Sequence, residues 1–178
     1  MKLRLLLMSA LLTIVIPMTA AGALGPSAPL VDVANGAFVH HYVRAGFVCG
    51  PDEVMVGIHI DHTQVVICAR LNFGYKVANR ITDRPHGTQV SDNPPMHGCP
   101  RDYLIQGLEL TGGSESLTCV SLMNAAGQAL VLTNELRDGH GATTSDIYGF
   151  NNPTMHACPR SYAMRGIHQD RNDLYCAG

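Results

Sequence analysis

Histidine is the residue type whose number and placement in this chain could support chemistry. The chain contains nine histidines, while charged residues make up only 15% of it. Four histidines occupy matching places: His97 and His156 lie two residues before a cysteine, and His59 and His168 lie ten residues after one. Imidazole is the commonest metal ligand in proteins, and together with thioether sulfur it suits copper. The pattern therefore predicts a site for copper or zinc.

A carboxylate takes the place of histidine in the middle copy of this pattern. Glu109 lies ten residues after the first cysteine of that copy, as His59 and His168 do in theirs. If the related strands meet at a common axis, these three side chains form a ligand set of two imidazoles and one carboxylate, which zinc also accepts. His97 and His156 are further candidate ligands.

Methionines accompany the histidines and extend the copper interpretation to thioether ligands. Met96 and Met155 directly precede two of the histidines, and Met55 and Met164 are expected on the strand face that carries the other two. The competing interpretation is that duplication of one structural unit repeats every residue in it, without creating a site. In that case the histidines cap loops or face solvent, and the methionines fill gaps beneath disulfides.

Three similar segments must position these residues, at 49–68, 99–119 and 158–176. Each begins and ends with cysteine, and each has a glycine eight residues after the first cysteine, followed by Ile or Leu. The separations of the two cysteines are 19, 20 and 18 residues, and the variation falls after the glycine, as in hairpins whose tips absorb insertions. We therefore expect three hairpins, each closed by its own disulfide: Cys49–Cys68, Cys99–Cys119 and Cys158–Cys176. Each bridge should contribute about 3 kcal/mol by restricting the unfolded chain.

The strands of these hairpins show the alternation of a half-buried sheet. In the first hairpin, Val54, Val56, Ile58 and Ile60 are predicted to form one face, and Met55, Gly57, His59 and Asp61 the other. The aliphatic position that follows each glycine, at Ile58, Leu108 and Ile167, should point into the core. A glycine inside a strand indicates close approach of a bulky group, and we expect that group to be the disulfide.

The connecting segments repeat as well. Residues 75–82 and 129–136 are each predicted to form a further strand, and the lead-ins at 93–101 and 152–160 match closely. The stretch 30–48 is expected to serve the third copy, which has no trailing segment of its own. The sequence thus predicts one all-β domain at 24–178, with three pseudo-symmetric repeats in a closed, β-prism-like or trefoil-like arrangement.

This pattern resembles a known family. A Cys-Pro start, a strand with an internal glycine before an aliphatic residue, a closing cysteine and three copies are similar to the β-prism proteins of the vitelline membrane outer layer type. The resemblance covers residues 49–176, and the chain departs from it in shorter Cys-to-Cys loops and low aromatic content. It implies three sheets around a pseudo-threefold axis and a carbohydrate-related role, but it carries over no functional residue.

The first 23 residues have the composition of a secretory signal peptide. Lys2 and Arg4 precede an apolar run from Leu5 to Ile16, and small residues follow at 21–23. The run is shorter than the roughly 20 residues that span a bilayer, and no later run is long enough, so we expect no membrane insertion after cleavage. An even number of cysteines in an exported chain favours disulfides. These features predict a secreted or periplasmic protein.

The net charge and the absence of known enzyme motifs disfavour two classes of function. Without Lys2 and Arg4, ten of the twelve basic residues remain against fourteen acidic ones, which argues against a nucleic-acid partner. The metalloprotease, phosphate-loop, dinucleotide and nucleophile-elbow motifs are absent from the sequence, which favours a binding protein over an enzyme. The prediction is an exported, non-catalytic protein that binds copper or zinc.

The alternative is a carbohydrate- or protein-binding module of the cell exterior. The three predicted hairpin tips carry short polar side chains that can hydrogen-bond sugar hydroxyls, at 61–62, 114–115 and 170–173. Such residues are also ordinary in solvated turns. A glycan and a metal ion are therefore both candidate partners on the sequence alone.

Overall fold

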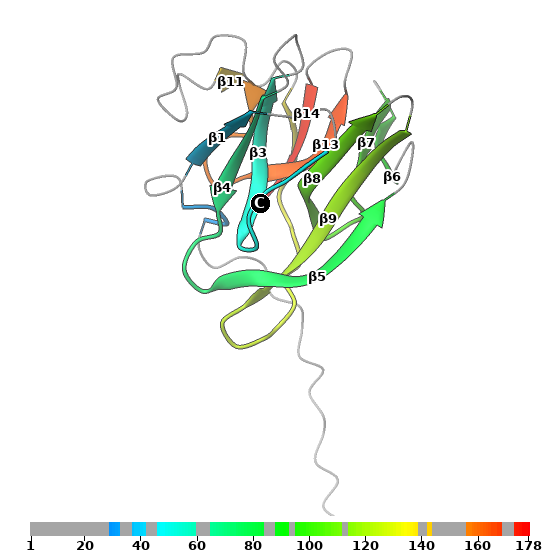
Figure 1. Cartoon of the computed structure of the whole chain (residues 1–178). Coiled ribbons are helices and arrows are strands. Elements are labelled where there is room, and N and C mark those ends of the chain that lie inside the picture. The colour runs from blue at the N-terminus through cyan, green and yellow to red at the C-terminus, as the bar shows by residue number, and fades with distance from the viewer. Residues whose placement is uncertain are drawn as a thin grey trace, which may run out of the picture.

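The fold is built entirely from β-strands in the part of the chain that the structure describes (Figure 1). This computed structural model describes residues 29–32, 37–41, 46–59, 65–83, 88–92, 95–111, 114–138, 142–143, 156–168 and 173–178. The predicted all-β class is confirmed. Within these residues, no helix has the length and apolarity needed to cross a membrane.

Three hairpins form the centre of the molecule, one in each predicted repeat. They are β3 (Glu53–His59) with β4 (Val65–Arg70), β8 (Tyr103–Thr111) with β9 (Ser114–Asn124), and β13 (Ala163–His168) with β14 (Asp173–Ala177). The disulfides join Cys49 to Cys68, Cys99 to Cys119 and Cys158 to Cys176, with Cα–Cα distances of 5.8, 5.5 and 5.8 Å. The predicted pairing within each repeat is confirmed. The predicted tip residues 61–62 and 170–172 lie outside the described residues.

Each hairpin is extended by a short strand that comes from another repeat. The lead-in of the first repeat, β2 (Phe47–Val48), pairs with β8; that of the second, β7 (Pro95–Gly98), pairs with β13; and that of the third, β12 (His156–Ala157), pairs with β3. The exchange continues one residue further. The amides of Cys49, Cys99 and Cys158 donate to the carbonyl oxygens of Gln106, Arg165 and Val56 at 2.8, 2.7 and 2.8 Å. Every repeat therefore contributes to two sheets.

Outer strands complete the sheets. They are β1 (Ala37–His41) beside β4, β5 (Tyr75–Asp83) beside β9 and β10 (Glu135–Asp138) beside β14, with β6 (Thr88–Asp92) beside β7 and β11 (Ala142–Thr143) beside β12. The predicted strand at 75–82 is confirmed. The one predicted at 129–136 begins only at Glu135; before it, Leu130 and Leu132 are buried without joining a strand. The stretch 30–48 supplies β1. This strand lies beside the second strand of its hairpin, β4, as β5 lies beside β9 and β10 beside β14.

A β-bulge interrupts the first strand of every hairpin, immediately before the repeated glycine. In the first hairpin the register shifts between Met55 and Gly57, so Val56 is an extra residue, and the other two hairpins shift at the same position. A bulge reverses the alternation of faces. The prediction that Val54, Val56 and Ile58 share a face is therefore wrong: the two valines pack in one buried cluster, and Ile58 packs with Met55 in another.

The repeated glycines make room for the exchanged strand. A Cβ on Gly57 would lie 2.6 Å from the carbonyl oxygen of His156 in β12, and one on Gly107 would lie 2.7 Å from that of Phe47 in β2. Neither distance is possible for a real side chain. The expectation that a disulfide occupies this space is wrong, because the close neighbour is the backbone of another repeat.

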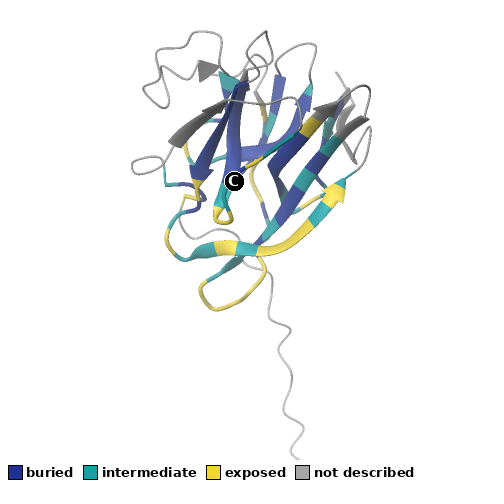
Figure 2. Cartoon of the chain, in the orientation of Figure 1, coloured by how far each residue is buried: buried dark blue, intermediate teal, exposed yellow. Residues whose placement is uncertain are grey.

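The core is threefold in character. One buried cluster holds all six cysteines together with Met55, Ile105 and Met164 and the aliphatic positions Ile58, Leu108 and Ile167, which are 3%, 4% and 6% exposed. The three first strands β3, β8 and β13 contact one another in pairs. Figure 2 shows their buried faces in dark blue, whereas β5 and the loop after β9 are largely exposed. The predicted core position is confirmed, while a prism-like or trefoil-like closure stays a prediction.

Candidate functional site

An open groove with a volume of about 690 Å³ lies between two turns of the first repeat. One wall is the turn 50–53, which leads from Cys49 into β3. The other is the turn 71–76 between β4 and β5, near the loop that follows β9 (Figure 1). The groove is lined by three carboxylates (Asp32, Asp52, Glu53), two cations (Arg70, Lys76), two aromatic rings (Phe73, Tyr75) and the amide of Asn72.

Phe73 stands at the rim of the groove with its whole side chain in solvent. Its relative exposure is 101%, and among the described residues the only other exposed large apolar side chain is Val48, at 51%. Single exposed apolar residues are ordinary on protein surfaces. Phe73 differs because it borders a groove and because its turn is held on several sides.

Asn72 holds that turn. Its Oδ1 accepts from the amide of Phe73 at 2.7 Å, and its carbonyl oxygen accepts from the amide of Tyr75 at 3.1 Å. Its own amide donates to the carbonyl oxygen of Leu30 at 2.9 Å, and its Nδ2 donates to that of Pro29 at 3.2 Å. The backbone of Phe73 is thus fixed both within the turn and against residues 29–30. Binding a ligand there would therefore cost little backbone entropy.

The residues that line the groove carry charges of both signs. Arg70 lies directly opposite Glu53 in the β3–β4 register, and its carbonyl oxygen accepts from the amide of Asp32 at 2.9 Å. Arg70 therefore has an acidic residue on each neighbouring segment, and directly opposed residues point to the same face. Lys76 lies beyond the aromatic turn and is exposed. The groove presents donors and acceptors rather than a field of one sign.

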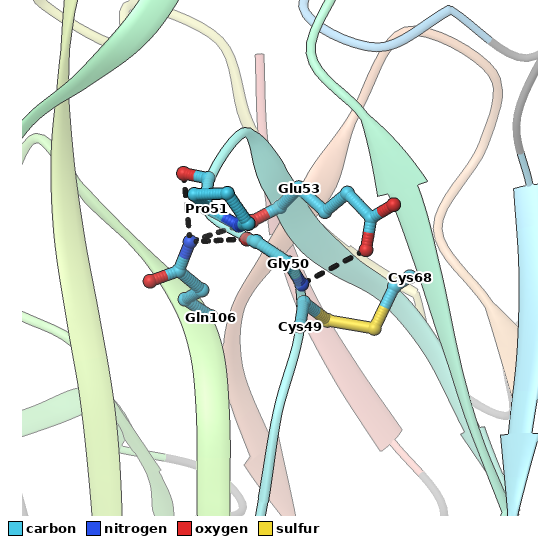
Figure 3. The surroundings of a disulfide bond; sticks show 6 residues. All are labelled: Cys49, Gly50, Pro51, Glu53, Cys68 and Gln106. Carbon is cyan, nitrogen blue, oxygen red and sulfur yellow. Dashed lines mark hydrogen bonds between the residues drawn. A yellow bond between two sulfur atoms is a disulfide. The ribbon is translucent and has the colours of Figure 1, made fainter.

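The opposite wall, the turn 50–53, is hydrogen-bonded both within itself and to the second repeat (Figure 3). The amide of Glu53 donates to the carbonyl oxygen of Gly50 at 3.1 Å, and the amide of Gly50 donates to Glu53 Oε2 at 2.9 Å. The buried Gln106 of the second repeat reaches it with its amide nitrogen. The wall is also joined to the other turn, because the amide of Leu71 donates to the carbonyl oxygen of Asp52 at 2.8 Å.

The residues predicted to bind metal are distributed over different sheets. Glu109 is exposed in β8, with its Cβ near Gly46, whereas His168 is half-buried in β13. His97 lies opposite Ile167 in β7, so His168, the next residue along β13, points to the other face of that sheet. His156 lies in β12, opposite Ile58.

No three His, Cys, Asp or Glu side chains within the described ranges are grouped as metal ligands would be. The structure describes the backbone of His59 but not its side chain, so the set of His59, Glu109 and His168 stays a prediction. The Nδ1 atom of His168 is buried and has no hydrogen-bond partner among the described residues. Met55 and Met164 are fully buried beside the disulfides, as expected if they fill gaps in the core, and Met155 lies outside the described residues.

A second polar cluster, in the third sheet, is structural in character. Arg165 is 7% exposed; it pairs with Glu135, and its Nε donates to the carbonyl oxygen of Cys99 at 3.2 Å. The hydroxyl of Tyr175 donates to Glu135 Oε2 at 3.0 Å. Burial of the phenol, and then its hydrogen bond to that carboxylate, raise the pKa of Tyr175 above its ordinary value. The arrangement ties β10 to β13 and β14.

The groove was not predicted from the sequence, although a signal was present. In a chain poor in aromatic residues, Phe73 and Tyr75 fall within three positions, beside Asn72 and Gly74, which are turn-forming residues. Sequence reasoning assigned this stretch only to the start of a connecting strand. The spatial neighbours that complete the groove, at 32 and 50–53, come from two other segments.

Comparison with known proteins gives no guide to this site: no family model, no curated protein and no solved structure matches the chain.

Proposed function

We propose that this protein is an exported, non-catalytic binding module that takes a neutral sugar into the groove beside Phe73. The observation that carries the proposal is the complete exposure of Phe73 on a turn that Asn72 fixes with four hydrogen bonds. Burying an aromatic ring of this size against a ligand removes a large apolar area from water. Because the backbone that carries the ring is already fixed, the ordering cost on the protein side is mainly the restriction of the Phe73 side chain itself.

The residues around the ring match the surface of a sugar. A pyranose ring has apolar C–H faces, which can lie against a phenyl ring, and a rim of hydroxyl groups that both donate and accept hydrogen bonds. Asp32 and Asp52 supply acceptors, Arg70 and Lys76 supply donors, and the binding of small molecules generally combines apolar lining with a few such polar groups.

Charge favours a neutral sugar over an acidic one. Three carboxylates face two cations in the groove, and Arg70 lies between two of the acidic residues. A polyanionic glycan would meet three acidic residues at this site, and like charges brought together oppose binding. The sequence pattern that resembles the vitelline membrane outer layer type implies a carbohydrate-related role, which is the same ligand class.

Export is part of the proposal. Three disulfides are typical of an oxidising compartment outside the cytoplasm. The signal-like composition of residues 1–23 supports secretion or a periplasmic location, and both compartments give access to external glycans.

A glycan array containing neutral and acidic oligosaccharides tests the proposal on the disulfide-intact protein. We expect binding to neutral sugars, with at least a tenfold loss for Phe73→Ala. Val48→Ala is the matched control, because it truncates the other exposed apolar side chain of the described residues. Equal binding by Phe73→Ala and wild type, or binding confined to acidic glycans, would overturn the proposal.

Binding of copper or zinc is the second proposed function. The observation in its favour is the buried Nδ1 of His168, which has no hydrogen-bond partner among the described residues. Neutral imidazole coordinates a metal ion through the lone pair of an unprotonated ring nitrogen, either Nδ1 or Nε2.

A further inference from the structure

One side chain from the second repeat controls the shape of the proposed groove. Gln106 is fully buried at the bulge of β8, and its Nε2 donates to the carbonyl oxygens of Gly50 and Glu53, each at 2.9 Å. A third acceptor, the carbonyl oxygen of Pro51, lies at 3.3 Å. An amide nitrogen has two hydrogens, so the two shorter bonds dominate. All three acceptors belong to the turn that forms one wall of the groove, as Figure 3 shows.

The equivalent positions in the other repeats do not hold their neighbouring turns in this way. The bulge residue is Val56 in the first repeat and Arg165 in the third. The valine side chain has no donor. Among the described residues, Arg165 donates to its neighbouring turn through Nε, to the carbonyl oxygen of Cys99 at 3.2 Å, while its Nη1 pairs with Glu135. The fold therefore offers three equivalent positions, and the one below the groove carries the amide.

The turn itself is also specialised. The second and third repeats have proline directly after their first cysteine, whereas the first repeat has Gly50. Proline has no amide hydrogen, but Gly50 uses its own to bind the carboxylate of Glu53 at 2.9 Å. The turn is thus held by Glu53, which belongs to it, and by Gln106 of the second repeat. Both holding residues act on the wall that presents Asp52 and Glu53 to the groove.

We infer that Gln106 is a positioning residue for ligand binding: it fixes the 50–53 wall of the groove from the neighbouring repeat, and so couples the second repeat to the site on the first. The inference rests on the proposed function for its consequence, the affinity for neutral sugars. Its structural part concerns the wall alone and is measurable without ligand. A wall held in its binding shape before the ligand arrives lowers the ordering cost of binding.

The test compares Gln106→Leu with Val56→Ala in the full disulfide-bonded protein. Leucine keeps most of the volume but removes both donors. Val56→Ala changes the equivalent buried bulge position, which adjoins the turn of the third repeat, and controls for general loss of stability. Amide hydrogen exchange is measured at Gly50, Glu53 and Leu71, and affinity is measured by titration of a neutral oligosaccharide, both well below the unfolding temperature.

We expect Gln106→Leu to raise exchange at these amides at least tenfold and to weaken sugar binding five- to tenfold, while Val56→Ala changes neither. Unchanged exchange would overturn the inference whatever the affinity. Faster exchange with unchanged affinity would also overturn it, leaving Gln106 a purely structural residue. If the wild-type protein binds no sugar, the proposed function fails, and the exchange measurement still decides whether Gln106 holds the wall.

Discussion

Single residues distinguish the three repeats most clearly at the bulge before the repeated glycine. The position holds Val56, Gln106 and Arg165, all buried, and each serves a different local purpose. Valine extends an apolar cluster, glutamine holds the wall of the groove, and arginine joins β13 to Glu135 of β10. Because a bulge adds a residue without altering the paired ones, it can vary between copies while the hairpin keeps its register.

The raised pKa of Tyr175 predicts that the stability of the fold depends on pH in the alkaline range. Its folded-state pKa is raised above 10.0, first by burial and then by the hydrogen bond to Glu135. The folded protein therefore holds the phenol proton more tightly than the unfolded chain, and the resulting stability is present below the ordinary pKa and lost as pH rises through the folded value. We expect the urea midpoint of the wild type to fall as the pH rises above about 10, the ordinary pKa of tyrosine. Tyr175→Phe should show a shallower fall; equal slopes would contradict the assignment.

Strand exchange between repeats is the main organising feature at the scale of elements. The strands β2, β7 and β12 are short, yet each lies against a hairpin of another repeat and is held by the amide of the following cysteine. Such pairing brings backbones close together, which explains the glycine in every hairpin.

Gly107 tests that explanation. A valine at this position would place its Cβ against the carbonyl oxygen of Phe47, so we expect Gly107→Val to lower the free energy of unfolding by about 2 kcal/mol or more. The control is Ala129→Val. Ala129 is exposed and forms an isolated antiparallel β-bridge with Met123, so valine there should change the free energy of unfolding by less than about 0.5 kcal/mol. Chemical denaturation measures both, and a neutral Gly107→Val would show that β2 does not pack there.

The hairpins could be predicted from sequence because their information is local. The cysteine spacing and the glycine position place both strands and the disulfide within about twenty residues, and residues 75–82 show their strand character directly. The bulge could not be predicted, since the alternation of Val54, Val56 and Ile58 is regular in the sequence and is broken only by the extra residue in the ladder. The exchange of β2, β7 and β12 depends on contacts between repeats, which a match between lead-in sequences does not specify.

At the scale of the whole molecule, pseudo-threefold repetition is combined with one asymmetric site. The disulfide-containing core draws on all three repeats, whereas the groove draws on residues 32, 50–53 and 70–76. The groove escaped sequence prediction for this reason: repetition drew attention to the residues that recur, and Phe73 and Gln106 do not recur. A duplicated scaffold leaves such positions free to diverge.

The predicted metal site requires side chains from all three repeats to converge. If His59, Glu109 and His168 form a site, titration should show one copper or zinc ion bound per chain, and His168→Ala should weaken that binding at least tenfold. His97→Ala is the comparison, since His97 points to the other face of its sheet. Binding that is unchanged in His168→Ala would reject this ligand set.

The most direct test of the groove as the functional site is an amide and side-chain chemical-shift titration of the disulfide-bonded protein with the neutral oligosaccharide that binds best on the array. We expect shifts confined to Phe73, Tyr75, Asn72 and the 50–53 turn, together with a change in the phenyl resonances of Phe73. Shifts that map instead to the residues predicted as sugar-binding tips, 61–62, 114–115 and 170–173, with Phe73 unaffected, would contradict this assignment of the site.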